Sequence, residues 1–266
     1  MVIVLSAWSP MSRAGDQGAG ETPAAGIHPG PGEYLTDVFL PHMWQGAKAS
    51  FTEEDSILAF GLGTALTVMA YTQDEKMDDY WDTEDPLGDT SFIGDVWGAG
   101  YIQAATCLGM YGWAHYTDNQ ELATTAEVLT EATLIQTIVI NSMKPLFSRK
   151  RPEWESWNSF PSGHTGAAFV MAAVLDHRLG HKWGVPLYAL ALFTGLSRME
   201  DRAHYASDVV MGATIATVVG YQTSRYHDDY PYEKTWHRKK LEKISIMPCF
   251  PENGEGYGIM ISMPLD

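Results

Sequence analysis

Long apolar stretches alternate with short polar breaks along the middle of this chain. Six stretches are prominent, at residues 57–71, 96–116, 122–147, 166–175, 185–197 and 209–223. They are rich in Ala, Leu, Met and Gly, and this composition and their length favour helices over strands. The pattern therefore predicts an all-α protein, a helical bundle of about six core helices.

The uncharged parts of these stretches bear on where the protein resides. Most are shorter than the about 18 apolar residues that a membrane span needs. The hydrophobic fraction of the whole chain, 45%, is also typical of a water-soluble protein. We therefore expect an exported or periplasmic protein that is soluble or peripheral. The alternative is an integral membrane protein with its site on the extracytoplasmic side.

The two ends of the chain differ from its apolar middle. Residues 1–33 combine a short apolar start with a segment rich in Gly, Pro and Ala, as in a flexible leader or an export signal. Residues 226–266 begin polar and end in short alternating runs around a Pro and Gly turn, which predicts a β-hairpin or an extended arm. The predicted helical domain between them covers residues 34–225.

Residues 74–89 (DEKMDDYWDTEDPLGD) carry a dense run of acidic side chains. This segment lacks the ordered Asp spacing and the Gly of a calcium-binding loop. Charge runs of this kind usually face water. We therefore expect a solvated loop here.

The formal net charge of -16 restricts the partners of this protein. A surface this acidic excludes nucleic acid, whose phosphates attract basic surfaces, and it disfavours tight docking on an anionic membrane surface. An anionic substrate would need a local cationic pocket. Five of the 17 Lys and Arg residues are candidates for it: Lys144, Arg149, Lys150, Arg151 and Arg198.

The segment SRMEDRAHYASD, residues 197–208, pairs a histidine with a carboxylate. His204 and Asp208 are four residues apart, so both lie on one face of a helix. The carboxylate can then accept the ring proton and leave the other ring nitrogen as a nucleophile. Arg198 would lie on a different face of a continuous helix, so we expect residues 198–202 to form a loop that returns Arg198 to the site.

Two earlier segments supply further cations and an anion cradle. In KPLFSRKRP, Lys144 and Arg151 are seven residues apart, which is two helical turns and nearly one face. In FPSGH, Ser162 and Gly163 precede an apolar helix whose first backbone N–H groups can hold an anion, and His164 follows them. Taken singly, these segments are also explained by helix capping and the helix dipole.

Together, the three segments resemble the motifs of a known superfamily. Lys, six residues and Arg-Pro come first, then Pro-Ser-Gly-His, then Ser-Arg, five residues, His, three residues and Asp. This order is similar to that of type 2 phosphatidic acid phosphatases, non-specific bacterial acid phosphatases and vanadium-dependent haloperoxidases. The likeness extends over about residues 93–220. Arg149 and Lys150 lie outside the motif pattern and would only raise the local positive potential.

The resemblance implies a role for eight residues and an active site at one end of the bundle. His204 would attack phosphorus and become a phosphohistidine, Asp208 would orient it, and His164 would protonate the leaving oxygen and then activate water. The phosphate would be bound by Lys144, Arg151, Ser162, Gly163 and Arg198. Fixed cations can replace metals in phosphoryl transfer, and no acidic, His or Cys cluster has metal-ligand spacing. We therefore expect no metal and no cofactor.

The resemblance implies a phosphatase that hydrolyses a phosphomonoester or pyrophosphate of a small molecule or a lipid. A vanadate-dependent haloperoxidase is one alternative, although members of that branch are usually much longer. A phosphotransferase, in which an acceptor hydroxyl replaces water, is another. A non-catalytic phosphate-binding protein is disfavoured because both histidines are present. The sequence leaves the substrate, membrane association and the oligomeric state open.

Overall fold

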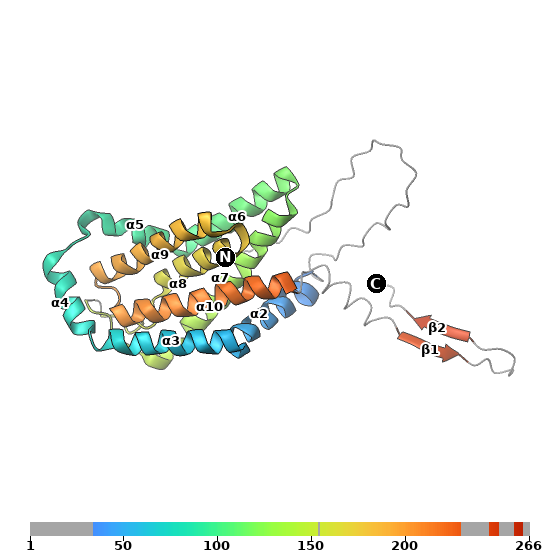
Figure 1. The fold of residues 1–266 in the computed structure, drawn as a ribbon, viewed down its shortest axis with the longest axis horizontal. Coiled ribbons are helices and arrows are strands. Elements are labelled where there is room, and N and C mark those ends of the chain that lie inside the picture. Colours follow the sequence, from blue (N-terminus) through green and yellow to red (C-terminus); the bar gives the residue numbers. More distant parts are fainter. Residues whose placement is uncertain (1–33, 154, 230–244, 250–257, 263–266) are drawn as a thin grey trace. The chain divides into compact units, whose positions relative to one another are not determined.

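The computed structural model describes residues 34–153, 155–229, 245–249 and 258–262, which fall into two compact units (Figure 1). The smaller unit combines Met1–His42 with Tyr230–Asp266. Its described elements include the π-helical turn η1 (Tyr34–Phe39) and the antiparallel strands β1 (Ser245–Cys249) and β2 (Gly258–Ser262). The predicted leader and most of the predicted C-terminal extension lie outside the described residues, so those assignments stay predictions.

The larger unit, Met43–Asp229, is an all-α bundle. The prediction of the fold class is confirmed. The helices, in chain order, are α2 (Leu40–Thr52), α3 (Glu54–Tyr71), α4 (Asp74–Glu84), the 3-10 turn η2 (Gly88–Thr90), α5 (Ser91–Trp97), α6 (Gly100–Thr117), α7 (Gln120–Phe147), α8 (Gly163–Leu179), α9 (His181–Glu200) and α10 (Ala206–Asp229).

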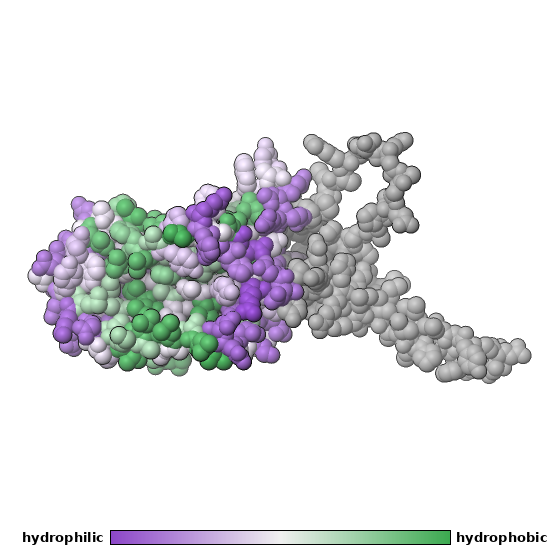
Figure 2. Space-filling view, in the orientation of Figure 1, coloured by the Kyte–Doolittle hydropathy of each residue, from purple (hydrophilic) through white to green (hydrophobic). Residues whose placement is uncertain are grey.

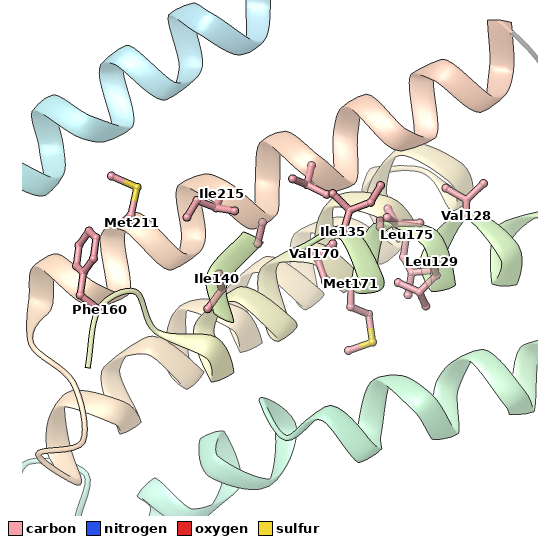
Figure 3. Close-up of a cluster of buried hydrophobic side chains, with 14 residues drawn as sticks. Val128, Leu129, Ile135, Ile140, Phe160, Val170, Met171, Leu175, Met211 and Ile215 are labelled. Carbon is pink, nitrogen blue, oxygen red and sulfur yellow. The ribbon is translucent and has the colours of Figure 1, made fainter. Parts of the chain in front are cut away.

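Helix α8 lies at the centre of the bundle and packs against α7, α9 and α10 (Figure 1). It is buried on nearly all sides, as expected of a helix that is apolar all round. Figure 3 shows the core that it forms with its neighbours, including Ile135, Ile140, Val170, Met171 and Ile215. Phe160, from the loop before α8, packs into the same cluster, so the core directly supports the FPSGH segment.

Helix α10 passes very close to the loop before α8. A Cβ atom at Gly212 would lie 2.5 Å from the backbone oxygen of Ser162, so only glycine fits there without a shift of the backbone. The backbone N–H of Ser162 donates to the backbone oxygen of Asp208 at 3.0 Å. These contacts join the second and third predicted motifs through the main chain.

Residues 74–84 of the acidic segment form helix α4, so the prediction of a loop was wrong for them, whereas residues 85–87 are non-helical and lead into η2. Asp74 and Trp81 are buried on this helix. Asp78 and Asp82 form ion pairs of 2.8 and 2.7 Å with Arg202, from the loop after α9. The partner that orders the helix is thus distant in the sequence. Figure 1 places α4 at the end of the bundle where α8 begins and α9 ends.

The loop predicted to start at Arg198 starts later, because α9 continues through Arg198 to Glu200. The chain then turns at Arg202, which has a φ of +47° in the left-handed region. After this turn the backbone N–H of His204 donates to the backbone oxygen of Arg198 at 3.2 Å. The turn, rather than an early end of the helix, therefore brings His204 back to Arg198.

Large apolar side chains are also exposed around the middle of the larger unit. Figure 2 shows apolar residues gathered in a band between two polar ends. We call the following exposed residues the apolar belt: Leu58, Leu62, Leu66, Leu108, Ile138 and Leu192. Among the described helices, none alone has the length and hydropathy of a membrane span, whereas α3 and α4, bent by 62°, reach both together.

Candidate active site

His204 and Asp208 form the buried centre of the candidate site, with 2% and 0% of their side chains exposed. Nδ1 of His204 lies 3.7 Å from Oδ2 of Asp208, beyond hydrogen-bond distance. Among the described residues, this nitrogen has no hydrogen-bond partner. Asp208 accepts hydrogen bonds from Ser159 Oγ (2.5 Å), Arg149 Nη1 (2.7 Å) and the Tyr205 N–H (2.9 Å). The carboxylate is therefore held in place beside the imidazole.

Burial lowers the pKa of His204 to about 4, with Asp208 opposing the shift and the cations Arg151 and Lys144 adding to it. The imidazole is therefore neutral at pH values well above 4, which leaves a ring lone pair available. The pKa of Asp208 is also lowered. Its burial acts in the opposite direction, but the His204 ring and the Arg149 guanidinium outweigh burial. Asp208 thus remains a carboxylate.

Lys144 and Arg151 are both held by Asn158, from the loop before α8. Nζ of Lys144 donates to the backbone oxygen of Asn158 at 2.8 Å, and Nε of Arg151 donates to its Oδ1 at 2.9 Å. Burial and the nearby Arg151 lower the pKa of Lys144 to about 8. Both cations also lower the pKa of His164 and of His204. Both imidazoles are thus within electrostatic reach of the same two cations.

Arg198 and His164 meet at Asp95, a carboxylate of α5. Nη1 of Arg198 donates to Oδ1 of Asp95, and Nε2 of His164 lies 3.3 Å from the same oxygen. Asp201 forms a further ion pair with Arg198. The buried Nε of Arg198 has no hydrogen-bond partner among the described residues. Burial and then Arg198 lower the pKa of His164, whereas Asp95 raises it.

Ser162 and Gly163 begin α8, where an anion cradle is predicted. Oγ of Ser162 caps the helix, because it accepts hydrogen bonds from the Thr165 N–H (3.4 Å) and hydroxyl (2.9 Å). A Cβ atom at Gly163 would meet nothing within 4 Å, so the space beside this residue is open. Gly163 and His164 occupy the first helical positions, whose N–H groups lack intrahelical acceptors. Such groups can bind an anion.

The structure thus brings the predicted residues to one end of the bundle in three contacts. Lys144 and Arg151 both donate hydrogen bonds to Asn158. His164 and Arg198 both contact Asp95, and His204 lies beside Asp208. Sequence reasoning missed the side chains Asn158, Ser159 and Asp95, which hold these residues, and it gave Arg149 only the role of raising the local positive potential. Asn158 and Ser159 directly precede the FPSGH segment, and this position in the sequence could have identified them as neighbours of the site. The sequence around Asp95 carries no such signal, because its partners are on distant helices.

Comparison with known proteins identifies the region that carries these contacts. Residues 126–231 match the family model described as the PAP2 superfamily. We call this matched segment the PAP2 region. The match contains all three motifs, from Lys144 to Asp208, so the predicted resemblance is confirmed.

Two relatives of this PAP2 region are lipid A phosphatases. The chain is 40% identical over 85 residues to the lipid A 1-phosphatase of Porphyromonas gingivalis, covering 31% of this chain and 19% of that protein. It is 37% identical over 110 residues to the lipid A 4'-phosphatase of Helicobacter pylori, covering 37% of this chain and 56% of that protein. The chain thus spans only part of the length of either relative.

A crystal structure of LpxE from Aquifex aeolicus aligns with a TM-score of 0.48 at 23% identity, covering 57% of this chain and 93% of that chain.

The PAP2 region does not include every residue that contacts the site. Asp74 of α4 and Asp95 of α5 both precede residue 126. Asp74 pairs with Arg149, and Asp95 pairs with Arg198. Helices α4 and α5 therefore complete the surroundings of a site whose motifs all lie further along the chain.

Proposed function

We propose that this protein is a metal-independent phosphatase that hydrolyses a phosphate ester or pyrophosphate of a lipid through a phosphohistidine on His204. The observation that carries the proposal is the buried, neutral imidazole of His204 beside a fixed carboxylate and within reach of cations. The match to the PAP2 superfamily supports phosphatase chemistry. The names of the two relatives support a lipid as the carrier of the phosphate.

In the first step, His204 attacks phosphorus. Its Nδ1 lies on the side of Asp208, so Nε2 is the nitrogen available for attack. The N–P bond forms while the P–O bond to the leaving group breaks, and His164 transfers its proton to the leaving oxygen. Negative charge on the non-bridging oxygens is balanced by the cations Lys144, Arg151 and Arg198.

In the second step, water attacks the phosphohistidine. His164, deprotonated by the first step, takes a proton from the water, and the N–P bond breaks to release inorganic phosphate and neutral His204. While His204 carries the phosphoryl group its ring is positively charged, and the fixed carboxylate of Asp208 stabilises that charge. Asp95, 3.3 Å from Nε2 of His164, favours the protonated form that starts each turnover.

The apolar belt supports a lipid substrate and a location at a membrane. Exposed apolar surface spread over several helices marks contact with lipid or protein, and here it includes Leu58 and Leu62, with 73% and 64% exposed. The motif residues lie at one polar end of the bundle, beside this belt (Figures 1 and 2). A lipid could thus place its phosphate among the cations and its chains against the belt. This favours the membrane alternative over the soluble, periplasmic protein expected from the sequence.

The direct test is to trap the covalent intermediate. The full chain is mixed with a radiolabelled lipid phosphate in detergent micelles and quenched with alkaline SDS, because phosphohistidine survives alkali and is lost in acid. We expect an acid-labile label on the wild-type protein and none on His204→Ala. The His177→Ala variant, changed at the other end of α8, serves as the matched control and should be labelled. Phosphate release without any trapped label, or label on the His204→Ala protein, would contradict the proposal.

A further inference from the structure

Asp74, the first residue of α4, is a buried carboxylate that the phosphatase mechanism above does not use. Only 4% of its side chain is exposed. It accepts three hydrogen bonds, from Arg149 Nη2 at 2.7 Å, from the Ser207 N–H at 3.0 Å and from Ser207 Oγ at 2.5 Å. Both donors, Arg149 and Ser207, lie next to the candidate site. A buried charge this well paired is held in one position.

Arg149 connects Asp74 to the catalytic centre. Its Nη1 donates to Oδ1 of Asp208 at 2.7 Å and to Oγ of Ser207 at 2.6 Å, while its Nη2 bonds to Asp74. The guanidinium carbon also lies 4.0 Å from the ring centroid of Tyr205 and 5.2 Å from that of Tyr71. These ring contacts and the planar fork of hydrogen bonds leave the guanidinium little freedom to rotate.

The two oxygens of Asp208 have separate partners. Oδ1 accepts from Arg149, whereas Oδ2 accepts from Ser159 and the Tyr205 N–H and is the oxygen 3.7 Å from His204 Nδ1. Arg149 therefore fixes the rotation of the carboxyl group and decides which oxygen faces the imidazole.

The shared cation also affects how much negative charge Asp208 offers to His204. Arg149 is paired with two carboxylates at equal distances of 2.7 Å. If Asp74 were neutral, the whole guanidinium charge would act on Asp208 alone, and less of the carboxylate charge would stabilise a phosphorylated His204. Asp74 thus bears on both the geometry and the charge of the His204–Asp208 pair.

We infer that Asp74 is a positioning residue, which through Arg149 and Ser207 holds Asp208 in the orientation that His204 needs for phosphoryl transfer. The inference rests on the function proposed above and extends it beyond the three motifs. Asp74 precedes the PAP2 region, residues 126–231, so the nucleophilic pair depends on a helix outside that region.

Helix α4 offers a matched control, because it has a second, partly buried attachment. Asp78 accepts hydrogen bonds of 3.1 and 2.8 Å from Nε and Nη2 of Arg202. If Asp74 only anchored the helix, Asp74→Asn and Asp78→Asn would have the same effect. If it positions Asp208, only Asp74→Asn slows the chemical step.

The experiment measures kcat, KM and the thermal unfolding midpoint of the full-length variants on a lipid phosphate in micelles. We expect Asp74→Asn to lower kcat about 10- to 100-fold, as is common for groups that orient a catalytic side chain, with KM within about 2-fold of wild type. Asp78→Asn should lower the unfolding midpoint similarly and kcat by no more than about 3-fold. Asp74→Glu, which restores the charge, should recover part of kcat. Equal kcat losses in the two Asn variants, or a loss confined to KM, would overturn the inference.

A second measurement separates this inference from the proposed function. In protein with isotope-labelled histidine, the His204 ring signal is identified by its loss in His204→Ala. At one fixed pH, this signal should shift in Asp74→Asn and stay in place in Asp78→Asn. An unchanged signal in Asp74→Asn contradicts the positioning role even if the wild type is active. A shifted signal in a protein that releases no phosphate from any lipid contradicts only the proposed function.

Discussion

The two ends of α8 carry similar residues in different surroundings. At its C-terminal end, Arg178 and His177 both pair with Asp228 of α10, whose side chain is 48% exposed. At its N-terminal end, His164 and Arg198 both contact Asp95 of α5, whose side chain is 50% exposed. Both ends thus place a histidine, an arginine and an aspartate together.

The balance of charges, rather than the exposure of the two groups, distinguishes the two ends. An exposed ion pair is screened by water and contributes little. At the N-terminal end, Lys144, Arg151 and Arg198 are partly or fully buried, and each of the first two lowers the pKa of both catalytic-candidate histidines. Cations that are crowded and desolvated gain most from a bound anion. Charge content alone therefore does not identify a phosphate site, whereas buried cations in excess do.

The largest expected effect comes from His204→Ala, which removes the proposed nucleophile at the N-terminal end. Turnover of a lipid phosphate should fall by at least about 10³-fold, while binding of the substrate to the protein survives. His177→Ala, at the C-terminal end, should retain turnover. Steady-state phosphate release and equilibrium binding measure the two effects. Turnover of His204→Ala near the wild-type rate would remove the basis for treating the two ends differently.

Removal of one cation should have the next largest effect. Arg198→Gln leaves Asp95 without its buried partner and removes a charge from the phosphate oxygens, so kcat should fall about 10²- to 10³-fold. Arg178→Gln breaks the half-exposed pair with Asp228 and should cost at most about 1 kcal/mol of unfolding free energy. Its kcat should stay near wild type. Similar kcat losses in both variants, with thermal melting showing folded protein, would mean that the excess of cations does not set the difference between the two ends.

The pH profile should show a smaller effect and tests the proton donor. Activity needs neutral His204, so it should rise with pH around the His204 pKa of about 4. It also needs protonated His164, whose pKa is lowered from the ordinary value of 6.5, mainly by burial, so activity should decrease again at a pH below 6.5. A bell-shaped curve with an acidic optimum follows. Asp95→Asn removes the charge that raises the pKa of His164, so the alkaline limb should move to lower pH, and only modestly because Asp95 is half exposed.

Profiles of kcat/KM against pH for wild type and Asp95→Asn measure the pH at which the alkaline limb falls. A limb that stays in place, or moves to higher pH, would show that His164 is not the group that loses its proton.

The smallest expected effect is that of a chelator. If Lys144, Arg151 and Arg198 balance the charge of the phosphate, phosphate release should be the same with and without EDTA. Vanadate, which resembles the pentacoordinate transition state, should inhibit the reaction. A loss of activity in EDTA that added metal restores would indicate a metal site that the sequence did not reveal.

The errors of sequence reasoning in this protein have two physical causes. Residues 74–84 have a strongly polar composition, and their helix is ordered by Arg202 and Arg149, which are far along the chain. For α9, helical hydrogen bonds carry the helix past Arg198, and the turn at Arg202 does what an early loop at Arg198 was expected to do. A long-range contact outweighed the local pattern in the first case, and local hydrogen bonds did so in the second.

The sequence by itself determined the helical class and the resemblance of its motifs to the PAP2 superfamily, because apolar spacing and the motif residues are local properties that can be read from neighbours a few positions apart. It also paired His204 with Asp208, but the predicted shared helical face was wrong, because His204 lies in the turn before α10, which begins at Ala206. Only the tertiary structure decided which groups hold them, because Asp74, Asp95 and Arg149 meet their partners across distant helices. Burial, which lowers the pKa of His204 to about 4, also exists only once the helices have packed.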